Sequence, residues 1–519
     1  MFEGHPKGLW ALALANTGER FGYYTMLAVF LFFLQDNFGF SMGTSSSIQA
    51  AFLGIVYFVP LFGGMLADKF GFGKMVTSGI VIMFLGYLLL SLPLGAGAVA
   101  LGVMALALLF ICIGTGLFKG NLQVLVGNLY DDPKYSAKRD EGFSIFYMAI
   151  NIGSMFAAAV ALSIMAWAQD SLGISKGDSY HYAFAVACVS LILSIVIYYA
   201  FRKTFAHADR AKIATPGAEV VEEELTPAQT KERIICLCLV FAVVIFFWMA
   251  FHQNGITMNQ FAREYTATSE TGFMSLFLSK SLSFTEIRSF WNLLLCVITV
   301  YGVLNIFQSK TAKGKAIASL VAVASVGVLV YKSMNVGGLE PVAVEAPIFQ
   351  QFNPCFVVAL TPIIGIIFGA LAKKGKEPSS PMKIGLGMLV AAMAFVVLLV
   401  ASWSLPAAEE QAAAVAAGTA TLVSPNWLIS TYFVLTIAEL LLSPIGISFV
   451  SKVAPPKYKG MMMGGWFAAT AIGNYLVSVP GLLWMRMPLW GIWVVLIAIC
   501  AIAGIFMFAN MKRIESATK

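Results

Sequence analysis

Long apolar stretches recur from one end of the chain to the other, and each is about as long as a helix that crosses a bilayer. A spanning helix needs roughly 20 predominantly apolar residues. Hydrophobic residues make up 59% of the 519 residues and charged residues only 11%, whereas roughly a quarter of a soluble domain is charged. The sequence therefore predicts an all-α polytopic membrane protein.

Hydropathy predicts fourteen membrane-spanning helices. Their approximate ranges are 8–36, 45–67, 74–95, 97–130, 141–168, 181–203, 233–262, 287–307, 315–332, 354–373, 382–403, 426–452, 461–486 and 488–511. The opening segment "MFEGHPKG" has no basic region, and no small-residue cleavage site follows the first apolar run. The first span is therefore expected to remain in the membrane as a helix.

The loops predict the orientation of these spans. Basic loops such as "ADKFGFGK" and "DDPKYSAKRDE" alternate with loops poor in Lys and Arg, such as "QDNFGFSMGTSSS". Cytoplasmic loops carry the excess of Lys and Arg, so we expect a multi-pass protein of the plasma (inner) membrane with both termini in the cytoplasm. The basic residues are spread over many short loops, which argues against a nucleic-acid partner and leaves membrane lipid as the surrounding partner.

The longest polar connection, residues 204–232, divides six predicted helices from eight. A cytoplasmic linker between two six-helix halves is typical of the major facilitator fold. We expect an N-terminal bundle at 1–203 and a C-terminal bundle at 233–519. The two extra helices, at about 287–332 between helices 7 and 8, have few polar residues, which predicts a hairpin packed on the outside of the bundle.

A Glu-Arg pair lies inside the first span, in "ANTGERFGYY" at 15–24. A charge at the bilayer centre costs at least ~2.5–3.5 kcal/mol, so Glu19 and Arg20 are expected to face the protein interior or an aqueous cavity. Neighbouring helical residues point about 100° apart, and we therefore expect each to have its partner elsewhere. A structural ion pair that locks this helix to another is the alternative to a functional role.

Two further charges lie deep in predicted spans. Lys119 precedes the end of helix 4 by about eleven residues, roughly 16 Å, which is beyond easy reach of a snorkelling side chain. Glu439 lies in the middle of helix 10, just before Ser443 and Pro444, with no basic residue near it in sequence. Lys119 is the predicted partner of Glu19, and intramembrane charges of this kind favour function.

Polar and aromatic residues of other spans are expected to surround these charges. For any one of them, an interhelical hydrogen bond or ordinary packing is the simpler account. Together they predict a cavity with Glu439 on one side and Lys119 and Arg20 on the other, which suits a small zwitterion. These residues are Tyr57, Asn151, His252, Gln253, Asn254, Asn353 and Trp466.

The loop "GGMLADKFGFGK" follows helix 2. Gly63 and Gly64 would allow close approach of helices, Asp68 could face a helix N-terminus, and Lys69 would lie on the cytoplasmic face. An ordinary basic loop is the alternative. The pattern resembles the loop signature of the major facilitator superfamily, which implies a conformational role for Gly64, Asp68 and Lys69.

Six ordered motifs resemble those of the proton-dependent oligopeptide transporter (POT/PTR) family. The family's helix 1 signature is Glu-x-x-Glu-Arg-Phe-x-Tyr-Tyr, and this chain has "NTGERFGYY" from Asn16. "GTGLFKGN" resembles the helix 4 motif Gly-x-Gly-x-x-Lys-Pro-Asn, with Gly120 in place of proline. The segments "FSIFYMAINIGS", "FNP", "AELLLSPIG" and "KGMMMGGWF" resemble further family segments in the right order. The resemblance covers the scaffold apart from 263–350.

The resemblance implies a symporter that moves di- and tripeptides inward with protons, by alternating access and without another cofactor. Glu19, Arg20 and Lys119 would form the proton-coupling network. Lys119 would also attract the peptide carboxylate, while Glu439, Asn151 and Asn353 would receive its amino terminus. Tyr24, Tyr57, Ser443 and Trp466 would complete the pocket, and a monomer would be sufficient for transport.

Three positions depart from the family pattern. Asn16 stands where the family has its first glutamate, and Leu27 where many members carry an arginine. His252 replaces an acidic residue on helix 7, and it could serve as a proton site or be a neutral, hydrogen-bonded histidine. These changes motivate an alternative cargo, another small zwitterion or an organic anion, with altered or absent proton coupling.

A membrane-embedded enzyme is the alternative hypothesis from a functional class other than transporters. The four histidines, His5, His181, His207 and His252, are scattered along the chain. The sequence contains no His-Glu-x-x-His motif, and its spans suggest no Ser/His/Asp set. These features argue against a protease or an acyltransferase.

Overall fold

The computed structural model describes residues 4–135, 138–209, 225–283, 286–309, 311–455 and 458–516, and these are almost entirely helical. Up to residue 209 the elements are α1 (Lys7–Asp36), α2 (Met42–Phe58), α3 (Pro60–Phe70), α4 (Phe72–Leu90), α5 (Ala98–Asn128), α6 (Arg139–Leu172), α7 (Lys176–Ala200), η2 (Arg202–Thr204) and η3 (Ala206–Ala208). We call this part of the chain the N-terminal half.

The C-terminal half begins at residue 225. Its elements are α8 (Pro227–Phe251), η4 (His252–Gly255), α9 (Thr257–Glu264), β1 (Ser269–Glu270), α10 (Ser275–Leu278), α11 (Trp291–Gln308), α12 (Ala312–Met334), β2 (Val342–Ala343), η5 (Ala346–Gln351), α13 (Phe352–Lys373), α14 (Ser380–Ser402), α15 (Ala408–Ala416), α16 (Asn426–Val453), α17 (Lys459–Leu476), α18 (Ser478–Leu483), α19 (Leu489–Ala509) and α20 (Met511–Ser516).

Thirteen helical stretches in the described part are long and apolar enough to cross a membrane, and they coincide with the second to the fourteenth predicted spans. The first predicted span forms α1, whose 30 residues would extend about 45 Å at 1.5 Å per residue. Glu19 and Arg20 lower the apolar character of α1, which explains why it is not among the thirteen. The prediction of an all-helical polytopic membrane protein is confirmed.

Several spans are built from two consecutive helices. Pro60 opens α3 directly after α2, and α8 gives way to the short 3-10 turn η4 at His252. Such breaks free backbone groups, and at membrane depth they are tolerated where they are buried in protein or line a cavity. Of the predicted linker 204–232, residues 210–224 lie outside the described residues. The helix that follows the linker begins earlier than predicted. A capping box formed by Thr226 and Gln229 starts α8 at Pro227 rather than at residue 233.

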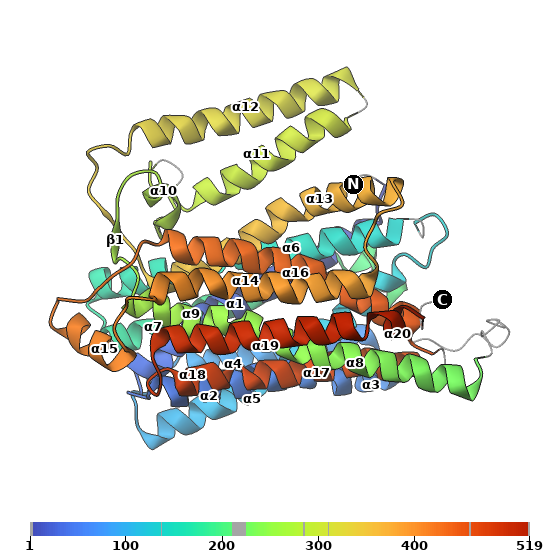
Figure 1. The fold of residues 1–519 in the computed structure, drawn as a ribbon, viewed down its shortest axis with the longest axis horizontal. Helices are drawn as coiled ribbons and strands as arrows, with labels where there is room; N and C mark the ends of the chain where they lie inside the picture. Colours follow the sequence, from blue (N-terminus) through green and yellow to red (C-terminus); the bar gives the residue numbers. More distant parts are fainter. Residues whose placement is uncertain are drawn as a thin grey trace.

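The long helices run side by side, and both termini lie at one end of the bundle (Figure 1). This arrangement fits an even number of crossings. At the opposite end lie α15 and the antiparallel pair of β1 and β2. We call this the Asp36 end, because α1 ends there with Asp36, and the end with the termini the linker end.

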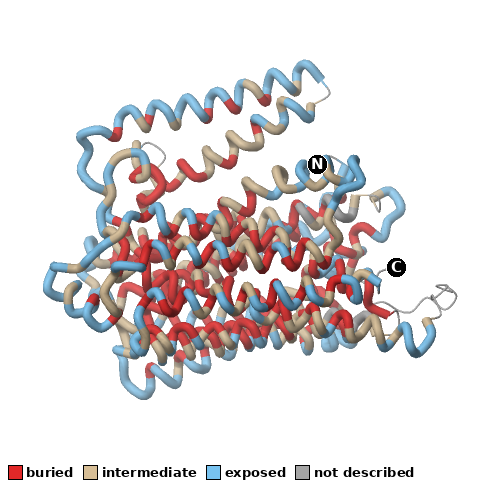
Figure 2. Tube along the Cα trace, viewed as in Figure 1, coloured by how far each residue is buried: buried red, intermediate tan, exposed pale blue. Residues whose placement is uncertain are grey.

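The α11–α12 hairpin lies on one side of the bundle, as the sequence predicted (Figure 1). The helix α12 is largely exposed along its length (Figure 2), and α11 contacts α13. The two hairpin helices approach closely at Gly302, where a Cβ would lie 3.1 Å from the Cβ of Ala322.

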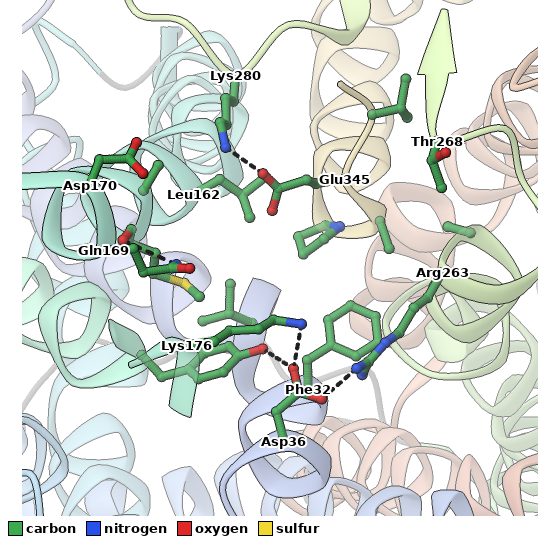
Figure 3. Close-up of a pocket in the computed structure, with 18 residues that line it drawn as sticks. Phe32, Asp36, Leu162, Gln169, Asp170, Lys176, Arg263, Thr268, Lys280 and Glu345 are labelled. Carbon is green, nitrogen blue, oxygen red and sulfur yellow. Dashed lines mark hydrogen bonds and ion pairs between the residues drawn. The ribbon is translucent and has the colours of Figure 1, made fainter. Parts of the chain in front are cut away.

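At the Asp36 end, the two halves are joined by an ion pair between Asp36 of α1 and Arg263 of α9 (Figure 3). Among the described residues, no other ion pair joins the halves. Hydrogen bonds add to it: Gln35 donates to Gln260 at 3.1 Å, and Gln49 donates to the carbonyl of Gly255 at 3.2 Å. The halves are therefore held together at this end.

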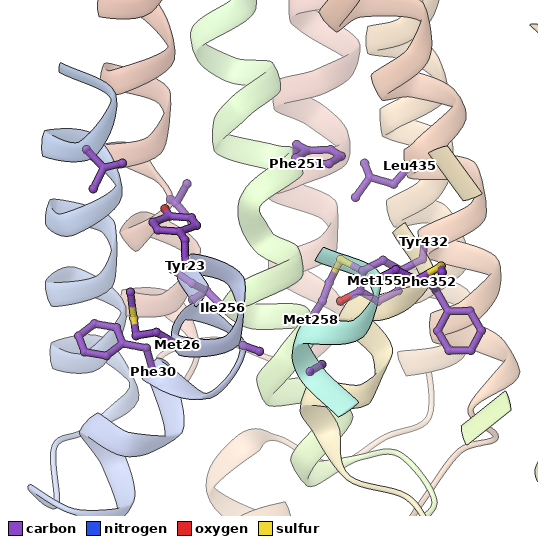
Figure 4. Close-up of a cluster of buried hydrophobic side chains, with 14 of the residues drawn as sticks. Tyr23, Met26, Phe30, Met155, Phe251, Ile256, Met258, Phe352, Tyr432 and Leu435 are labelled. Atoms are coloured by element: carbon purple, nitrogen blue, oxygen red, sulfur yellow. The ribbon is translucent and has the colours of Figure 1, made fainter. Parts of the chain in front are cut away.

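The buried core combines side chains from both halves (Figure 4). The helix α1 is central to it and packs along α6 and α7. Gly22 allows the close approach to α7, since a Cβ there would lie 3.2 Å from the Cα of Ala187. Figure 4 shows Tyr23, Met26, Phe30, Met155, Phe251, Ile256, Met258, Phe352, Tyr432 and Leu435 of this core. The packing holds Glu19 and Arg20 of α1 inside the protein.

Candidate functional site

A cavity of about 300 Å³ lies between the two halves, with walls from α1, α2, α5 and α6 on one side and from α8, η4, η5, α13, α16 and α17 on the other. It brings together ten of the predicted site residues from eight separate segments: Arg20, Tyr24, Tyr57, Lys119, Asn151, His252, Asn353, Glu439, Ser443 and Trp466. Glu19 is not on this wall but lies beside Arg20.

Glu19 and Arg20 pair with each other. The Nη2 atom of Arg20 donates to Oε1 of Glu19 at 2.5 Å, and its Nε donates to Oε2. The prediction that each would find its partner elsewhere is wrong, because the long arginine side chain folds back and presents its fork of donors to the adjacent carboxylate. Both side chains are buried, so the pair neutralises two charges at the cavity wall.

Lys119 of α5 lies over the ring of Tyr57, with its Nζ atom 3.9 Å from the ring centroid. The predicted ion pair between Lys119 and Glu19 is wrong for this structure. Within the described part of the chain, Lys119 has no carboxylate within 4.0 Å. The negative face of an aromatic ring attracts the ammonium without neutralising its charge. The lysine is therefore placed to meet an anionic group in the cavity.

Glu439 of α16 is held by neutral donors. The side-chain amide of Asn353 donates to Oε2 at 2.9 Å, and the hydroxyl of Tyr147 donates to Oε1 at 3.4 Å. Asn353 also donates to Thr436 at 3.0 Å, which fixes the orientation of its amide. Among the described residues, no cation lies within 4.0 Å of Glu439. The carboxylate is therefore available to a cationic group of a bound molecule.

Sequence reasoning missed Tyr147. It precedes Asn151 by one helical turn in "FSIFYMAINIGS", and the Asn151 amide donates to its carbonyl at 3.0 Å. That spacing places both residues on the same face of α6, which was the available signal. Gln123, Ser154, Trp248 and Gln350 are further polar or aromatic residues of the cavity wall that had not been singled out.

His252 lies where α8 ends, and the break turns its ring toward the cavity. It stacks on Trp248, with ring centroids 5.2 Å apart, and lies 6.4 Å from the ring of Tyr57. Its Nε2 atom has no hydrogen-bond partner among the described residues, nor has Oγ of Ser443. Unpaired polar atoms at a cavity wall are suited to hydrogen bonds with a ligand or with water.

The segment predicted as a loop after helix 2 is helical instead, because Pro60 starts α3 and Gly71 is the single residue between α3 and α4. It contributes no residue to the cavity wall. Gly63, but not Gly64, provides the close helix contact: a Cβ on Gly64 would meet nothing within 4 Å, which corrects the expectation for that glycine. Lys69 is exposed in the last turn of α3. The side chain of Asp68 lies outside the described part of the structure.

The two sides of the cavity carry charges of opposite sign, and each side belongs to one half of the protein. Arg20 and Lys119 come from the N-terminal half, and Glu439 comes from the C-terminal half. Aromatic rings and amides occupy much of the wall between them. A solute cavity between two helical halves, at the breaks of discontinuous helices, is the arrangement of a major facilitator transporter.

Comparison with known proteins identifies the family. The family model described as "PTR2: POT family" matches residues 73–483. The chain therefore belongs to the POT family, the proton-dependent oligopeptide transporters of the major facilitator superfamily. The family indicated by the sequence motifs is therefore confirmed. The protein is a membrane transporter, and its family is not one of enzymes.

The curated relatives match over nearly their whole length. The chain is 28% identical to the "Uncharacterized transporter YclF" of Bacillus subtilis, over 93% of this chain and 89% of the relative. It is 28% identical to the "Peptide transporter YePEPT" of Yersinia enterocolitica, over 100% and 97%. It is 26% identical to the "Di-/tripeptide transporter" of Lactococcus lactis, over 90% and 87%.

A solved structure shows the same fold. It is the crystal structure of a POT family transporter in complex with 5-aminolevulinic acid, with a TM-score of 0.72 and 20% identity. The match covers 99% of this chain and 98% of the other.

Proposed function

We propose that this transporter imports di- and tripeptides together with protons. The observation that carries the proposal is the cavity with free charge of opposite sign on its two sides, Lys119 on one and Glu439 on the other. The ends of a peptide are fixed charges and its side chains vary. A site that binds the ends firmly and the middle loosely accepts many peptides.

Each end of the peptide has its own set of partners in this proposal. The ammonium group lies against Glu439, whose orientation is fixed by Asn353 and Tyr147. The carboxylate lies near Lys119 and Arg20. Asn151 joins Glu439 and Asn353 around the amino terminus. The remaining predicted binding residues contact the middle of the peptide and complete the wall: Tyr24, Tyr57, Ser443 and Trp466.

Transport proceeds by alternating access of the N-terminal and C-terminal halves around this cavity. With both termini in the cytoplasm of the plasma (inner) membrane, the Asp36 end faces outward. The contacts that join the halves at that end then correspond to a conformation closed to the outside. The part of α3 that contains Gly64, Asp68 and Lys69 acts in the rearrangement, and a monomer suffices.

Protons are the coupling ion, and no other cofactor takes part. The buried Glu19–Arg20 pair is the central element. Protonation of Glu19 would free the guanidinium of Arg20, which could then turn toward the peptide carboxylate beside Lys119. His252 lies across the cavity with an unpaired Nε2 atom and could accept a second proton.

Uptake of a radiolabelled dipeptide into proteoliposomes, with and without an inward proton gradient, tests the proposal. We expect accumulation above the external concentration only with the gradient. Equal uptake under both conditions would contradict proton coupling, and a lack of both uptake and exchange would contradict peptide as the cargo.

A second cargo class is favoured by a specific observation. Leu27 lines the cavity at the position where many family members carry an arginine, so the cationic side is weaker than usual. The solved POT family structure with 5-aminolevulinic acid shows that a relative binds a small zwitterion. Competition of dipeptide uptake by 5-aminolevulinic acid and by organic anions distinguishes the two cargoes.

A further inference from the structure

Glu264, the last residue of α9, accepts hydrogen bonds from neutral groups only. Gln260 donates its side-chain amide to Oε1 at 2.6 Å, and the indole of Trp484 donates to Oε2 at 3.1 Å. In the described part of the chain, Glu264 makes no ion pair. It is a partly buried carboxylate at the outward-closed end of the protein, and among the described residues it has no ion-pair partner within 4.0 Å.

A hydrogen-bonded chain connects Glu264 to the ion pair that joins the halves. From Gln260 it continues to Gln35 of α1, whose side-chain amide donates to the side-chain oxygen Oε1 of Gln260 at 3.1 Å. Gln35 in turn accepts from Nη1 of Arg263 at 3.0 Å. Arg263 holds Asp36 with its other terminal nitrogen. The chain passes from the C-terminal half to the N-terminal half and back.

All the bonds of this chain point in one direction. Arg263 donates to Gln35, Gln35 donates to Gln260, and Gln260 donates to Glu264. Each glutamine accepts with its oxygen and donates with its nitrogen, so its orientation depends on the neighbour on either side. An acceptor at Glu264 is therefore required for the whole chain to keep this orientation.

We propose that Glu264 is the residue through which external protons open the outer side of this transporter. A proton on Glu264 removes the negative charge that strengthens the hydrogen bond from Gln260, because charge-assisted hydrogen bonds are about twice as strong as neutral ones. The Gln260 amide is then held less tightly. Its side-chain oxygen becomes a less firmly placed acceptor for Gln35, and the contact between the halves weakens. The inference deepens the proposed function and rests on it, since it names a proton site for import.

The charged and titratable neighbours of Glu264 are few. On its own segment they are Arg263, whose charge acts on Glu264, and Tyr265. The helix α15 packs against α9 and carries Glu409 and Glu410, both exposed. Its Gln411 donates to the Glu264 carbonyl at 2.7 Å.

Other elements around α9 bring further charges to Asp36 rather than to Glu264. From α7, Tyr180 donates to Asp36 at 2.7 Å and Lys176 lies 3.0 Å from it. Glu345 precedes η5 and pairs with Lys280 at 2.5 Å. From η4, His252 faces the central cavity, and α18 ends next to Trp484, which is not titratable.

The ion pair itself lies at the wall of a second cavity of about 330 Å³. Figure 3 shows Asp36 at its base, reached by Lys176 from one side and Arg263 from the other. Once the chain through Gln35 is released, Arg263 is still held by Asp36 and by the ring of Phe32, whose centroid lies 4.7 Å from its Cζ atom. Lys176 already contacts Asp36 and can satisfy it when the two halves part.

Distances across the outer end test the inference directly. Spin labels on Ser171 at the end of α6 and Ala412 of α15, both exposed, report the separation of the halves. The background variant replaces the exposed Cys238 by serine. Pulsed electron paramagnetic resonance is recorded from about pH 8 to about pH 5, a range in which carboxylates away from bulk water titrate. We expect the distance distribution to shift to longer distances as the pH falls.

Glu264→Gln is expected to abolish this shift, giving the same distribution at both pH values. The matched control Glu410→Gln, on the exposed face of α15, is expected to keep it. Gln260→Leu breaks the chain without touching the carboxylate and should also abolish the shift. This second variant decides the question if Glu264→Gln does not elute as a monodisperse protein.

A shift in Glu264→Gln equal to that of the parent would overturn the inference, as would a parent protein without any shift. The measurement requires no substrate, so its outcome is independent of dipeptide uptake. A parent that shows the shift but transports no dipeptide would contradict the proposed cargo and leave the role of Glu264 standing.

Discussion

The side-chain amide of Asn353 donates to Glu439 at 2.9 Å and aims this carboxylate at the central cavity. Hydrogen bonds to charged groups contribute about 1.5–3 kcal/mol, and about 1.4 kcal/mol is a factor of ten in affinity. Glu439→Gln is therefore expected to weaken dipeptide binding about tenfold or more, as measured by competition for labelled peptide.

The matched control for this prediction is Glu409→Gln, which lies on an exposed face of α15 and should leave affinity unchanged. An N-acetylated dipeptide lacks the ammonium group. It should therefore displace labelled peptide equally poorly from the parent protein and from Glu439→Gln. Undiminished affinity of Glu439→Gln for the free dipeptide would contradict the proposed role of the carboxylate.

The ring of Tyr57 holds the ammonium of Lys119 at 3.9 Å from its centroid. Such contacts are worth about 0.5–2 kcal/mol, so Tyr57→Leu is expected to raise the KM for dipeptide by about two- to thirtyfold. Tyr57→Phe keeps the ring and should stay close to the parent. If both variants raised KM equally, the hydroxyl rather than the ring would be responsible.

The α11–α12 hairpin is expected to be dispensable for transport. Gly302→Leu forces a side chain against Ala322, and overpacking of this kind costs about 1–3 kcal/mol. We expect a lower unfolding temperature with an unchanged initial rate of dipeptide uptake. In Gly327→Leu the added side chain meets open space, so neither quantity should change. Loss of uptake in properly folded Gly302→Leu would assign the hairpin a role in transport.

Much of the cavity could be predicted from the sequence, because a charge or amide within an apolar span has few acceptable places to lie. Lys119, Glu439 and Asn353 come from three separate helices, and all three face the cavity. Hydropathy also located the hairpin, since its length and position depend only on local composition. These are properties that each segment carries by itself.

The pairing of side chains could not be predicted in the same way. Glu19 and Arg20 were expected to point apart, but arginine is long enough to fold back onto its neighbour. The chain from Gln35 to Gln260 has no sequence signal, since it depends on how the end of α1 meets α9. Neutral glutamines near helix ends look the same in a sequence whether or not they connect two halves.

The buried Glu19–Arg20 pair provides the sharpest test of proton coupling. Glu19→Gln leaves Arg20 without its charged partner, which costs about 3–5 kcal/mol for a buried pair, so the unfolding temperature should fall. The double variant Glu19→Gln with Arg20→Gln removes the stranded charge and should regain stability. Both variants lack the Glu19 carboxylate, so neither should accumulate dipeptide under an inward proton gradient.

Glu19→Gln is still expected to exchange labelled dipeptide across the membrane, because Lys119 and Glu439 remain in the cavity. Proteoliposomes loaded with unlabelled dipeptide measure this exchange at equal pH on both sides. Accumulation driven by the proton gradient in Glu19→Gln would show that the coupling proton binds elsewhere. His252, whose Nε2 atom faces the cavity without a partner among the described residues, would then be the next residue to replace.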